Sequence, residues 1–214
     1  MKVLRLIPSR MESKRLPSKS LLPISGLPLV IHTYKRANLS KLLDKTLICT
    51  DSKKIIQTAK KYKSKAIMTS PYHKNGTERI AEAYLKEKNK YDLIVDIQGD
   101  EPLISPYHID EVIKFHIKNF DADIVLPTLK INFPDNPNLI KVVTNKKNDV
   151  MYLSRNKIPF EAKNKAFFLK HLSIISFKPS ALLKFAKSNQ TSLEKIEDIE
   201  LLRALEIGLK IKTV

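Results

Sequence analysis

The sequence predicts an α/β protein with a doubly wound, mostly parallel sheet and an antiparallel arm or extension. Short apolar runs alternate with segments of helical periodicity through the first 130 residues, which is the pattern of β-α-β units. After residue 131 the alternation stops, and two strand-like runs follow each other directly. A length of 214 residues with 43% hydrophobic content suits a single integrated domain.

The strands and helices of the first part are of ordinary length. We expect strands at residues 3–7, 46–50, 66–68, 93–97 and 123–129. Helices are expected between them at residues 28–39, 53–62, 77–88 and 106–118. Asn75 with Glu78 resembles a capping box, and Ser105 before Pro106 is an N-cap followed by proline at the first helical position.

The later part begins with a loop rich in proline and asparagine at residues 132–137. Runs at 139–144 and 150–154 predict a hairpin, with a further strand at 172–177 and helices at 181–187, 193–196 and 199–206. Thr191 and Glu194 have capping-box spacing, and Gly208 predicts a helix end. We therefore expect an α/β core at 1–130, an extension at 131–178, and C-terminal helices with a strand returning to the core at 179–214.

The composition predicts an anionic partner and excludes several classes of protein. Lys and Arg number 39 against 22 Asp and Glu, a formal charge of +17, but the basic residues are scattered. A specific nucleic-acid surface concentrates its charge on one face, so no specific nucleic acid is expected. The lone cysteine, Cys49, excludes an intrachain disulfide. No leader or membrane span is visible, and we expect a cytoplasmic protein.

The first strand is followed by a basic loop, residues 8–19. The four glycines of the chain form neither a dinucleotide fingerprint nor a P-loop, so cationic side chains must replace a glycine cradle for phosphates. Arg10, Arg15 and Lys19, on a loop stiffened by Pro17, can neutralise a triphosphate and its departing pyrophosphate. The alternative is a solvated basic loop.

The fourth strand ends at a candidate metal ligand. Asp100 follows Gly99, which permits close backbone approach, and one carboxylate is enough for Mg²⁺ bound to nucleotide phosphates. Alternatively, Asp100 caps the next turn. Asp51 follows the second strand and precedes a helix, where an N-cap role is favoured over a ligand role.

A third loop, residues 73–79, leads into a helix. Its Arg79 can hold an anion or a ribose hydroxyl, but helix capping alone is the favoured interpretation. His32, His108 and His116 lack partners at zinc spacing, so core or surface roles are expected.

Together these loops resemble the 3-deoxy-manno-octulosonate cytidylyltransferase (CMP-Kdo synthetase) family, whose fold is of the nucleotide-diphospho-sugar transferase type. The resemblance covers essentially the whole chain. The matching blocks are Ile7-Pro8-Ser9-Arg10 through Arg15-Leu16-Pro17-Ser18-Lys19, residues 73–79, Gln98-Gly99-Asp100-Glu101-Pro102, Asn136-Pro137-Asn138 with Lys141-Val142-Val143, Tyr152-Leu153-Ser154-Arg155 with Ile158-Pro159, Lys170-His171-Leu172, and Leu193-Glu194 with Glu197 and Leu202-Arg203.

The resemblance implies a reaction and a set of roles. The anomeric hydroxyl of Kdo attacks the α-phosphorus of CTP, giving CMP-Kdo for lipopolysaccharide precursors and pyrophosphate, with Mg²⁺ on the phosphates. A homodimer built partly by the extension is also implied. The implied residues are Arg10, Arg15 and Lys19 for the phosphates, Asp100 for the metal, Pro8, Ser9 and Arg79 for the nucleotide, and Gln98, Arg155, His171 and Glu194 for the sugar acid.

The sequence departs from the family at three places. Ser18 and Ser20 replace Gly and Pro in the phosphate loop, and Leu201 replaces a glutamine near the sugar. The sequence also ends before the family's C-terminal segment, whose Asp supplies another metal ligand. Alternatives are therefore a cytidylyltransferase for another acidic sugar, such as 8-amino-Kdo or a nonulosonic acid, or a catalytically impaired basic homologue that binds nucleotide or nucleic acid.

Overall fold

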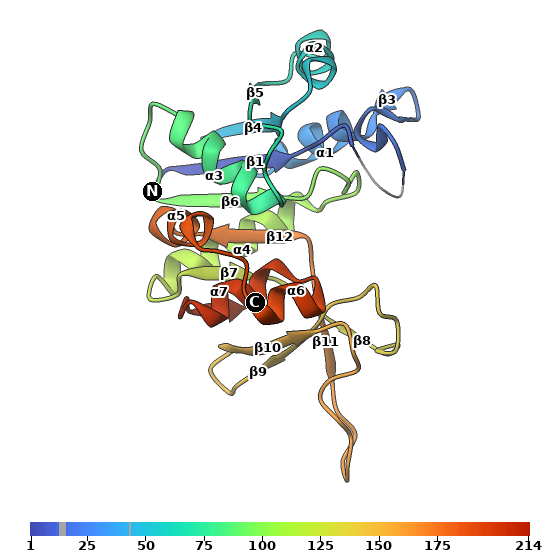
Figure 1. Cartoon of the computed structure of the whole chain (residues 1–214), viewed down its shortest axis with the longest axis vertical. Helices are drawn as coiled ribbons and strands as arrows, with labels where there is room; N and C mark the ends of the chain where they lie inside the picture. The colour runs from blue at the N-terminus through green and yellow to red at the C-terminus, as the bar shows by residue number, and fades with distance from the viewer. Residues whose placement is uncertain (13–15, 43) are drawn as a thin grey trace.

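The computed structural model describes residues 1–12, 16–42 and 44–214. A seven-stranded sheet crosses this part of the chain in the order β13-β7-β12-β6-β1-β4-β5 (Figure 1). Neighbouring strands are parallel except where β12 lies between β6 and β7, which confirms the doubly wound, mostly parallel sheet. Its strands are β1 (Val3–Pro8), β4 (Lys45–Thr50), β5 (Ala66–Met68), β6 (Leu93–Ile97), β7 (Ile124–Leu126), β12 (Ile174–Phe177) and β13 (Ile211–Thr213).

Helices cover both faces of this sheet, because each has one apolar stripe that must be buried. One buried cluster joins the sheet to α3 (Gly76–Lys86), α5 (Pro179–Lys187) and α7 (Glu200–Glu206). A second cluster joins the opposite face to α1 (Leu29–Ala37), α2 (Lys53–Lys61) and α4 (Pro106–Lys118). None of the helices described is both long and apolar enough to cross a membrane.

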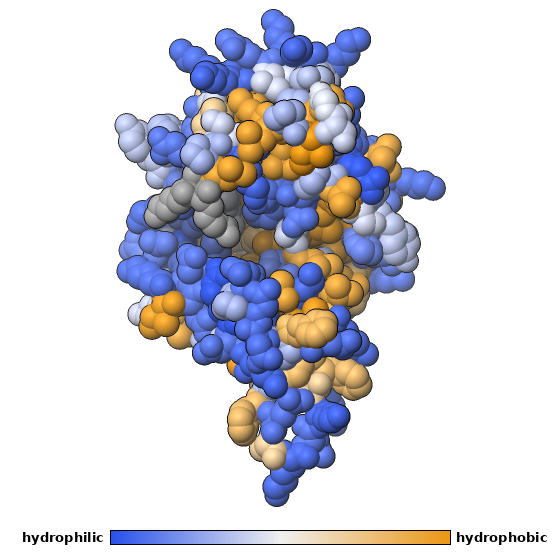
Figure 2. All heavy atoms as spheres, turned by 90° about the vertical axis from the view of Figure 1, so that its right-hand side faces the viewer, coloured by the Kyte–Doolittle hydropathy of each residue, from blue (hydrophilic) through white to orange (hydrophobic). Residues whose placement is uncertain are grey.

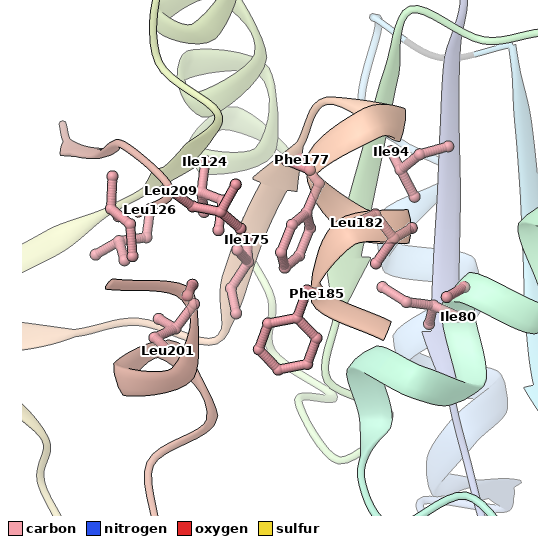
Figure 3. Close-up of a cluster of buried hydrophobic side chains, with 14 of the residues drawn as sticks. Ile80, Ile94, Ile124, Leu126, Ile175, Phe177, Leu182, Phe185, Leu201 and Leu209 are labelled. Atoms are coloured by element: carbon pink, nitrogen blue, oxygen red, sulfur yellow. The ribbon is translucent and has the colours of Figure 1, made fainter. Parts of the chain in front are cut away.

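The first cluster packs around two aromatic rings (Figure 3). Phe177 of β12 and Phe185 of α5 are almost fully buried. They lie beside Leu182 of α5, with Ile80 of α3 and Ile94 of β6 on the adjoining side. Burying a large apolar side chain stabilises the fold by roughly 1.5–3 kcal/mol. This packing holds α3 and α5 firmly against the strands that end at the site described below.

A separate four-stranded antiparallel sheet lies beyond the edge of the main sheet, with the order β10-β9-β11-β8 (Figure 1). The predicted hairpin is confirmed as β9 pairing antiparallel with β10. Between β10 and β11 the chain makes the long projection at the bottom of Figure 1. The strands are β8 (Thr128–Ile131), β9 (Lys141–Thr144), β10 (Val150–Ser154) and β11 (Phe168–His171).

Two expected strands are interrupted where the chain passes between the sheets. The run predicted at 123–129 is divided at Pro127 into β7 and β8, since proline has no N–H for the ladder. The strand predicted at 172–177 begins at Ile174, and the preceding β11 was missed. Both crossings lie together, because the backbone N–H of Leu172 donates to the carbonyl oxygen of Pro127 at 3.1 Å.

The predicted helix signals are largely confirmed. Asn75 accepts from the N–H of Glu78 at 2.8 Å, and Thr191 with Glu194 forms the capping box of α6 (Ser192–Glu197). Gly208 has φ 74° after α7, where a side chain would be strained, and its N–H donates to the carbonyl of Leu205. A short 3₁₀ turn (Lys19–Leu21) and a small hairpin of β2 (Pro23–Ile24) with β3 (Leu27–Pro28) complete the elements.

Candidate active site

The ends of β1 and β6 meet at a close backbone contact. A Cβ atom on Gly99 would lie 2.7 Å from the carbonyl oxygen of Pro8, so no other residue fits without displacing the loop. The hydroxyl of Thr33 also donates to the carbonyl of Gly99 at 3.2 Å. The basic loop after β1 and the Gln98-Gly99-Asp100 loop after β6 are therefore neighbours. They lie at the carboxyl ends of the strands, where α/β proteins bind ligands.

A first hollow of about 660 Å³ opens at this edge. Figure 2 views the molecule from the side to which β1 runs, and its surface is hollowed between the main sheet and the second sheet. All three predicted loops contribute to the walls. The lining residues are Pro8, Ser9, Arg10, His73, Lys74, Asn75, Gly76, Arg79, Gln98, Arg155, Gln190, Glu194, Lys195, Asp198, Ile199 and Glu200.

A second hollow, also of about 660 Å³, adjoins the first. Gln98, Asp198, Ile199 and Glu200 line both. The predicted sugar-acid residues are thus divided: Arg155 and Glu194 line the first hollow, His171 lines the second, and Gln98 lines both. The second hollow is also lined by Thr77, Asp96, Glu101, Leu103, Ile104, Ser105, His108, Leu129, Asn138, Leu139, Ile140, Lys170, Leu172, Ser173, Ile174, Ile175 and Leu201.

Lys19 and Asp100 form an ion pair next to Gly99. The Lys19 Nζ lies 2.5 Å from Asp100 Oδ2, and both side chains are partly exposed, at 38% and 46%. Among the described residues no group of three or more His, Cys, Asp or Glu can hold a metal. A single accessible carboxylate suits Mg²⁺ that takes its other ligands from phosphates and water, and does not suit an all-protein cage. Arg15 lies outside the described residues.

Arg79 is buried in the wall of the first hollow rather than extended into it. Its guanidinium donates to Asp51 Oδ2 at 2.7 Å, to Thr69 Oγ1 at 2.7 Å and to the carbonyl oxygen of Ser70 at 3.2 Å. These bonds hold the loop that precedes α3 against the end of β4. The structure therefore gives Arg79 a bracing contact that its place in the sequence did not reveal.

The expectation that Asp51 caps a helix is wrong. The N-cap of α2 is Ser52, whose Oγ accepts from the N–H of Ile55 at 3.4 Å. Asp51 is one residue too early for the cap and turns to the buried cation of Arg79 instead. The charge of Arg79 is thereby compensated within the protein.

Arg155 joins the end of β10 to the segment after α6. Its Nε donates to the carbonyl of Glu197 at 2.8 Å and its Nη2 to the carbonyl of Asp198 at 2.9 Å. The carboxylate of Asp198 is 3.5 Å away and almost fully exposed. Arg155 thus presents a positive charge to the first hollow while neutral carbonyl groups hold its position.

Glu194 is engaged by a residue whose role the sequence did not suggest. Arg203 is fully buried and donates to both carboxylate oxygens of Glu194, at 2.6 and 2.5 Å. It also reaches Glu78 at 3.2 Å. The fork geometry of arginine matches a carboxylate, so Glu194 is fixed in the wall of the first hollow.

Comparison with known proteins identifies the family of this chain. Residues 4–211 match the cytidylyltransferase family. Among similar proteins, 3-deoxy-manno-octulosonate cytidylyltransferase of Chloroherpeton thalassium is 36% identical over 100% of this chain and 89% of its own, and that of Fusobacterium nucleatum is 40% identical over 100% and 88%. The 8-amino-3,8-dideoxy-manno-octulosonate cytidylyltransferase of Shewanella frigidimarina is 37% identical over 99% and 89%.

A solved structure agrees. The CMP:2-keto-3-deoxy-manno-octonic acid synthetase complexed with CTP superimposes with a TM-score of 0.95 at 31% identity, covering 100% of this chain and 89% of that one. This chain belongs to the cytidylyltransferase family. The predicted resemblance is confirmed. Because cytidylyltransferases are nucleotidyltransferases, the chain is a nucleotidyltransferase.

His171 contributes no positive charge to the second hollow of this cytidylyltransferase. Burial lowers the pKa of His171 to about 4, so its imidazole is neutral at neutral pH. Its Nδ1 is buried and has no hydrogen-bond partner in the part of the chain that the structure describes. His171 therefore adds no second cation to that of Arg155, and a sugar-binding role for each stays a prediction.

A buried and a half-buried carboxyl group in the second hollow, Asp96 and Glu200, were missed. Asp96 is 2% exposed in the middle of the main sheet, and burial followed by repulsion from Glu200 raises its pKa well above the usual range. Burial also raises the pKa of Glu200, although its carboxylate accepts from Thr77 Oγ1 at 2.6 Å. An aspartate inside an otherwise apolar strand, residues 93–97, was the signal available in the sequence.

A prediction follows for the buried histidines. Burial also lowers the pKa of His116 to about 4, and this core residue contacts Ser176 Oγ at 2.8 Å. Because these folded-state pKa values lie below the unfolded value of about 6.5, their contribution to stability is complete above that pH and is lost as the pH falls toward 4. NMR titration should show both imidazoles protonating near pH 4.

The His171→Gln variant identifies one of these two signals and should flatten the decrease in melting temperature between pH 7 and 4. A midpoint near 6.5 for the His171 signal would contradict its burial.

Proposed function

We propose that this cytidylyltransferase transfers CMP from CTP to 3-deoxy-manno-octulosonate (Kdo) and releases pyrophosphate. The observation that carries the proposal is the pair of adjoining hollows that share Gln98 at the carboxyl end of β6. One has a cationic lining suited to a nucleotide, and the other can take a sugar. The names of the similar proteins support the choice of both substrates.

The first hollow receives the triphosphate. Arg10 and Lys74 lie in its lining, and Gly76 begins α3, whose N-terminal N–H groups favour anions. Lys19 belongs to the same basic loop, residues 8–19, as Arg10. The anomeric hydroxyl of the sugar forms a bond to the α-phosphorus as the bond to the pyrophosphate oxygen breaks, and the hydroxyl proton passes to water. The protein's part is to position the groups and neutralise their charge.

Mg²⁺ is the proposed cofactor, with Asp100 as its ligand from this chain. The position of its carboxylate supports this, since the side chain is 46% exposed and lies beside Lys19. The ion would neutralise phosphate oxygens when bound.

The sugar acid is assigned to Gln98, Arg155, His171 and Glu194. Arg155 supports this best, because carbonyl groups position its guanidinium and its one carboxylate partner, Asp198, is 3.5 Å away and almost fully exposed. A carboxylate beside the anomeric carbon offers two oxygens to such a group. Gln98 lies between the hollows and can contact the sugar near the reacting hydroxyl.

We also propose a homodimer built through the extension, a cytoplasmic location and a role in lipopolysaccharide precursor synthesis. The extension exposes large apolar side chains that solvent does not favour: Phe133 is 81% exposed, Phe160 88% and Phe167 78%. Figure 2 shows pale orange side chains among hydrophilic ones on the lower projection. Exposed aromatic groups of this kind suit a surface that contacts a second copy.

The first prediction from this proposal concerns substrate choice. Pyrophosphate release should require CTP and a 2-keto-3-deoxy sugar acid together, with Kdo the best of a panel of such acids. UTP and ATP should support release at least about tenfold more slowly, since a difference of 1.4 kcal/mol in transition-state binding gives that factor. Equal rates with the three nucleotides, or release with neutral sugars, would contradict the proposal.

The second prediction concerns Asp100. The Asp100→Asn change keeps the shape of the side chain and removes its charge, so turnover at saturating Mg²⁺ should fall by about 100-fold or more. The melting temperature should change little, because exposed ion pairs contribute only about 0–1 kcal/mol. Asp121→Asn is the matched control, since Asp121 also pairs with a lysine on the surface, Lys210. Full turnover by Asp100→Asn, or in excess chelator, would overturn the metal assignment.

The third prediction separates the two substrates. Arg155→Ala should raise the apparent KM for the sugar acid about tenfold or more and leave that for CTP within about twofold, whereas Lys19→Ala should do the reverse. Both constants are measured for each variant, together with the native mass. Equal effects of Arg155→Ala on both constants, with loss of the dimer, would instead make Arg155 a brace of the extension.

A further inference from the structure

Asp96 is the one ionisable side chain of β6, and it lines the second hollow. Its Oδ2 accepts a hydrogen bond from Gln98 Nε2 at 3.2 Å. Its Oδ1 is buried and has no hydrogen-bond partner among the described residues. Buried polar atoms are nearly always paired, so an unpaired oxygen in the wall of a hollow indicates a partner that the protein does not itself provide.

The surroundings of Asp96 disfavour its charged form. Glu200 repels it from α7, and the carboxylate of Glu101, which accepts from Ser173 Oγ at 2.8 Å, lines the same hollow. Lys170 and the neutral His171 line the hollow from β11. The buried thiol of Cys49 on β4 also interacts electrostatically with Asp96. Burial is the largest influence on Asp96 and raises the pKa of its carboxyl group, which favours the protonated form.

Protonation assigns different roles to the two oxygens. Gln98 donates to Oδ2, which suits the carbonyl oxygen because that is the better acceptor of a protonated carboxyl group. The proton then resides on Oδ1, where the described part of the chain offers no acceptor. A hydroxyl or carboxylate oxygen of a bound molecule can accept it.

We propose that Oδ1 of Asp96 donates a hydrogen bond to an oxygen atom of the acceptor sugar in the second hollow, and that Asp96 thereby helps to select the sugar acid. The inference rests on the proposed function, because it takes the second hollow as the place of the sugar. It adds a specificity residue that acts as a neutral donor. An ionised Asp96 would instead recruit an ammonium group.

Two substitutions at Asp96 test the donor. Asp96→Leu keeps the approximate size and removes both oxygens, so the apparent KM for the sugar acid should rise about tenfold while that for CTP stays within about twofold. Asp96→Asn restores an N–H donor without a titratable group, and should recover the KM for the sugar acid to within about threefold of the wild type. Calorimetric titration with Kdo measures the same differences without turnover.

A second measurement needs no substrate. Since the folded-state pKa of Asp96 is raised, the wild type loses stability as the pH rises from about 4 toward that value, and Asp96→Asn does not. The melting temperature of Asp96→Asn relative to wild type should therefore increase between pH 4 and 8.

Asp110 provides the matched control for this measurement. It is also buried, but it accepts from Ser40 Oγ at 2.6 Å and from the N–H groups of Lys41 and Leu42, and its pKa is lowered. Asp110→Asn should destabilise the protein at pH 7, and the difference should shrink as the pH falls through the acidic range. The two variants should thus have opposite effects at neutral pH.

Three results would overturn the inference: a wild-type KM for the sugar acid in Asp96→Leu, no recovery in Asp96→Asn, or a wild-type preference for the 8-amino-3,8-dideoxy acid that Asp96→Asn abolishes. Failure of the wild type to release pyrophosphate would overturn the proposed function instead. Kdo binding and the pH dependence of stability would still decide the inference in that case.

Discussion

The buried guanidinium of Arg203 is the interaction on which both hollows depend. It donates to Glu194 on α6 and to Glu78 on α3, while Glu78 also accepts from the N–H of Lys74. One cation therefore joins the loop before α3 to the C-terminal helices. Removing one partner of a buried ion pair leaves an uncompensated charge, which costs about 3–5 kcal/mol. These joined segments supply part of the lining of the first hollow, and three of their residues, Asp198, Ile199 and Glu200, also line the second.

A second buried cation, Lys141, fixes the part of the walls that comes from the second sheet and its loops. Lys141 is fully buried, and its Nζ donates to the carbonyl oxygens of Asn136 at 3.0 Å, Leu139 at 2.7 Å and Arg155. Leu139 lines the second hollow and Arg155 lines the first, so one ammonium group fixes a part of each. An ammonium group has three donors, and all three are used. The second sheet is thereby coupled to both hollows.

Local patterns in the sequence predicted most of the fold, and nonlocal partners account for most of what they missed. Apolar alternation located the main strands, and capping residues located the starts of α3 and α6, because those signals lie within a few neighbouring residues. The division at Pro127 depends on which sheet each half joins. Likewise, the loops of the site were identified, but Arg79 could not be assigned to Asp51, nor Arg203 to Glu78, since 28 and 125 residues separate these partners.

The distribution of charge explains how an overall basic protein can hold two anions side by side. The first hollow has cations in its lining, as a triphosphate requires. The second hollow is lined by Asp96, Glu101, Asp198 and Glu200, which as four carboxylates would repel a sugar acid. Burial raises the pKa of both Asp96 and Glu200, so this lining carries less negative charge than its composition suggests. Desolvation at the end of β6 thus favours the neutral, hydrogen-bonding form of two of these groups, which is compatible with a polyhydroxy acid whose carboxylate is held at Arg155.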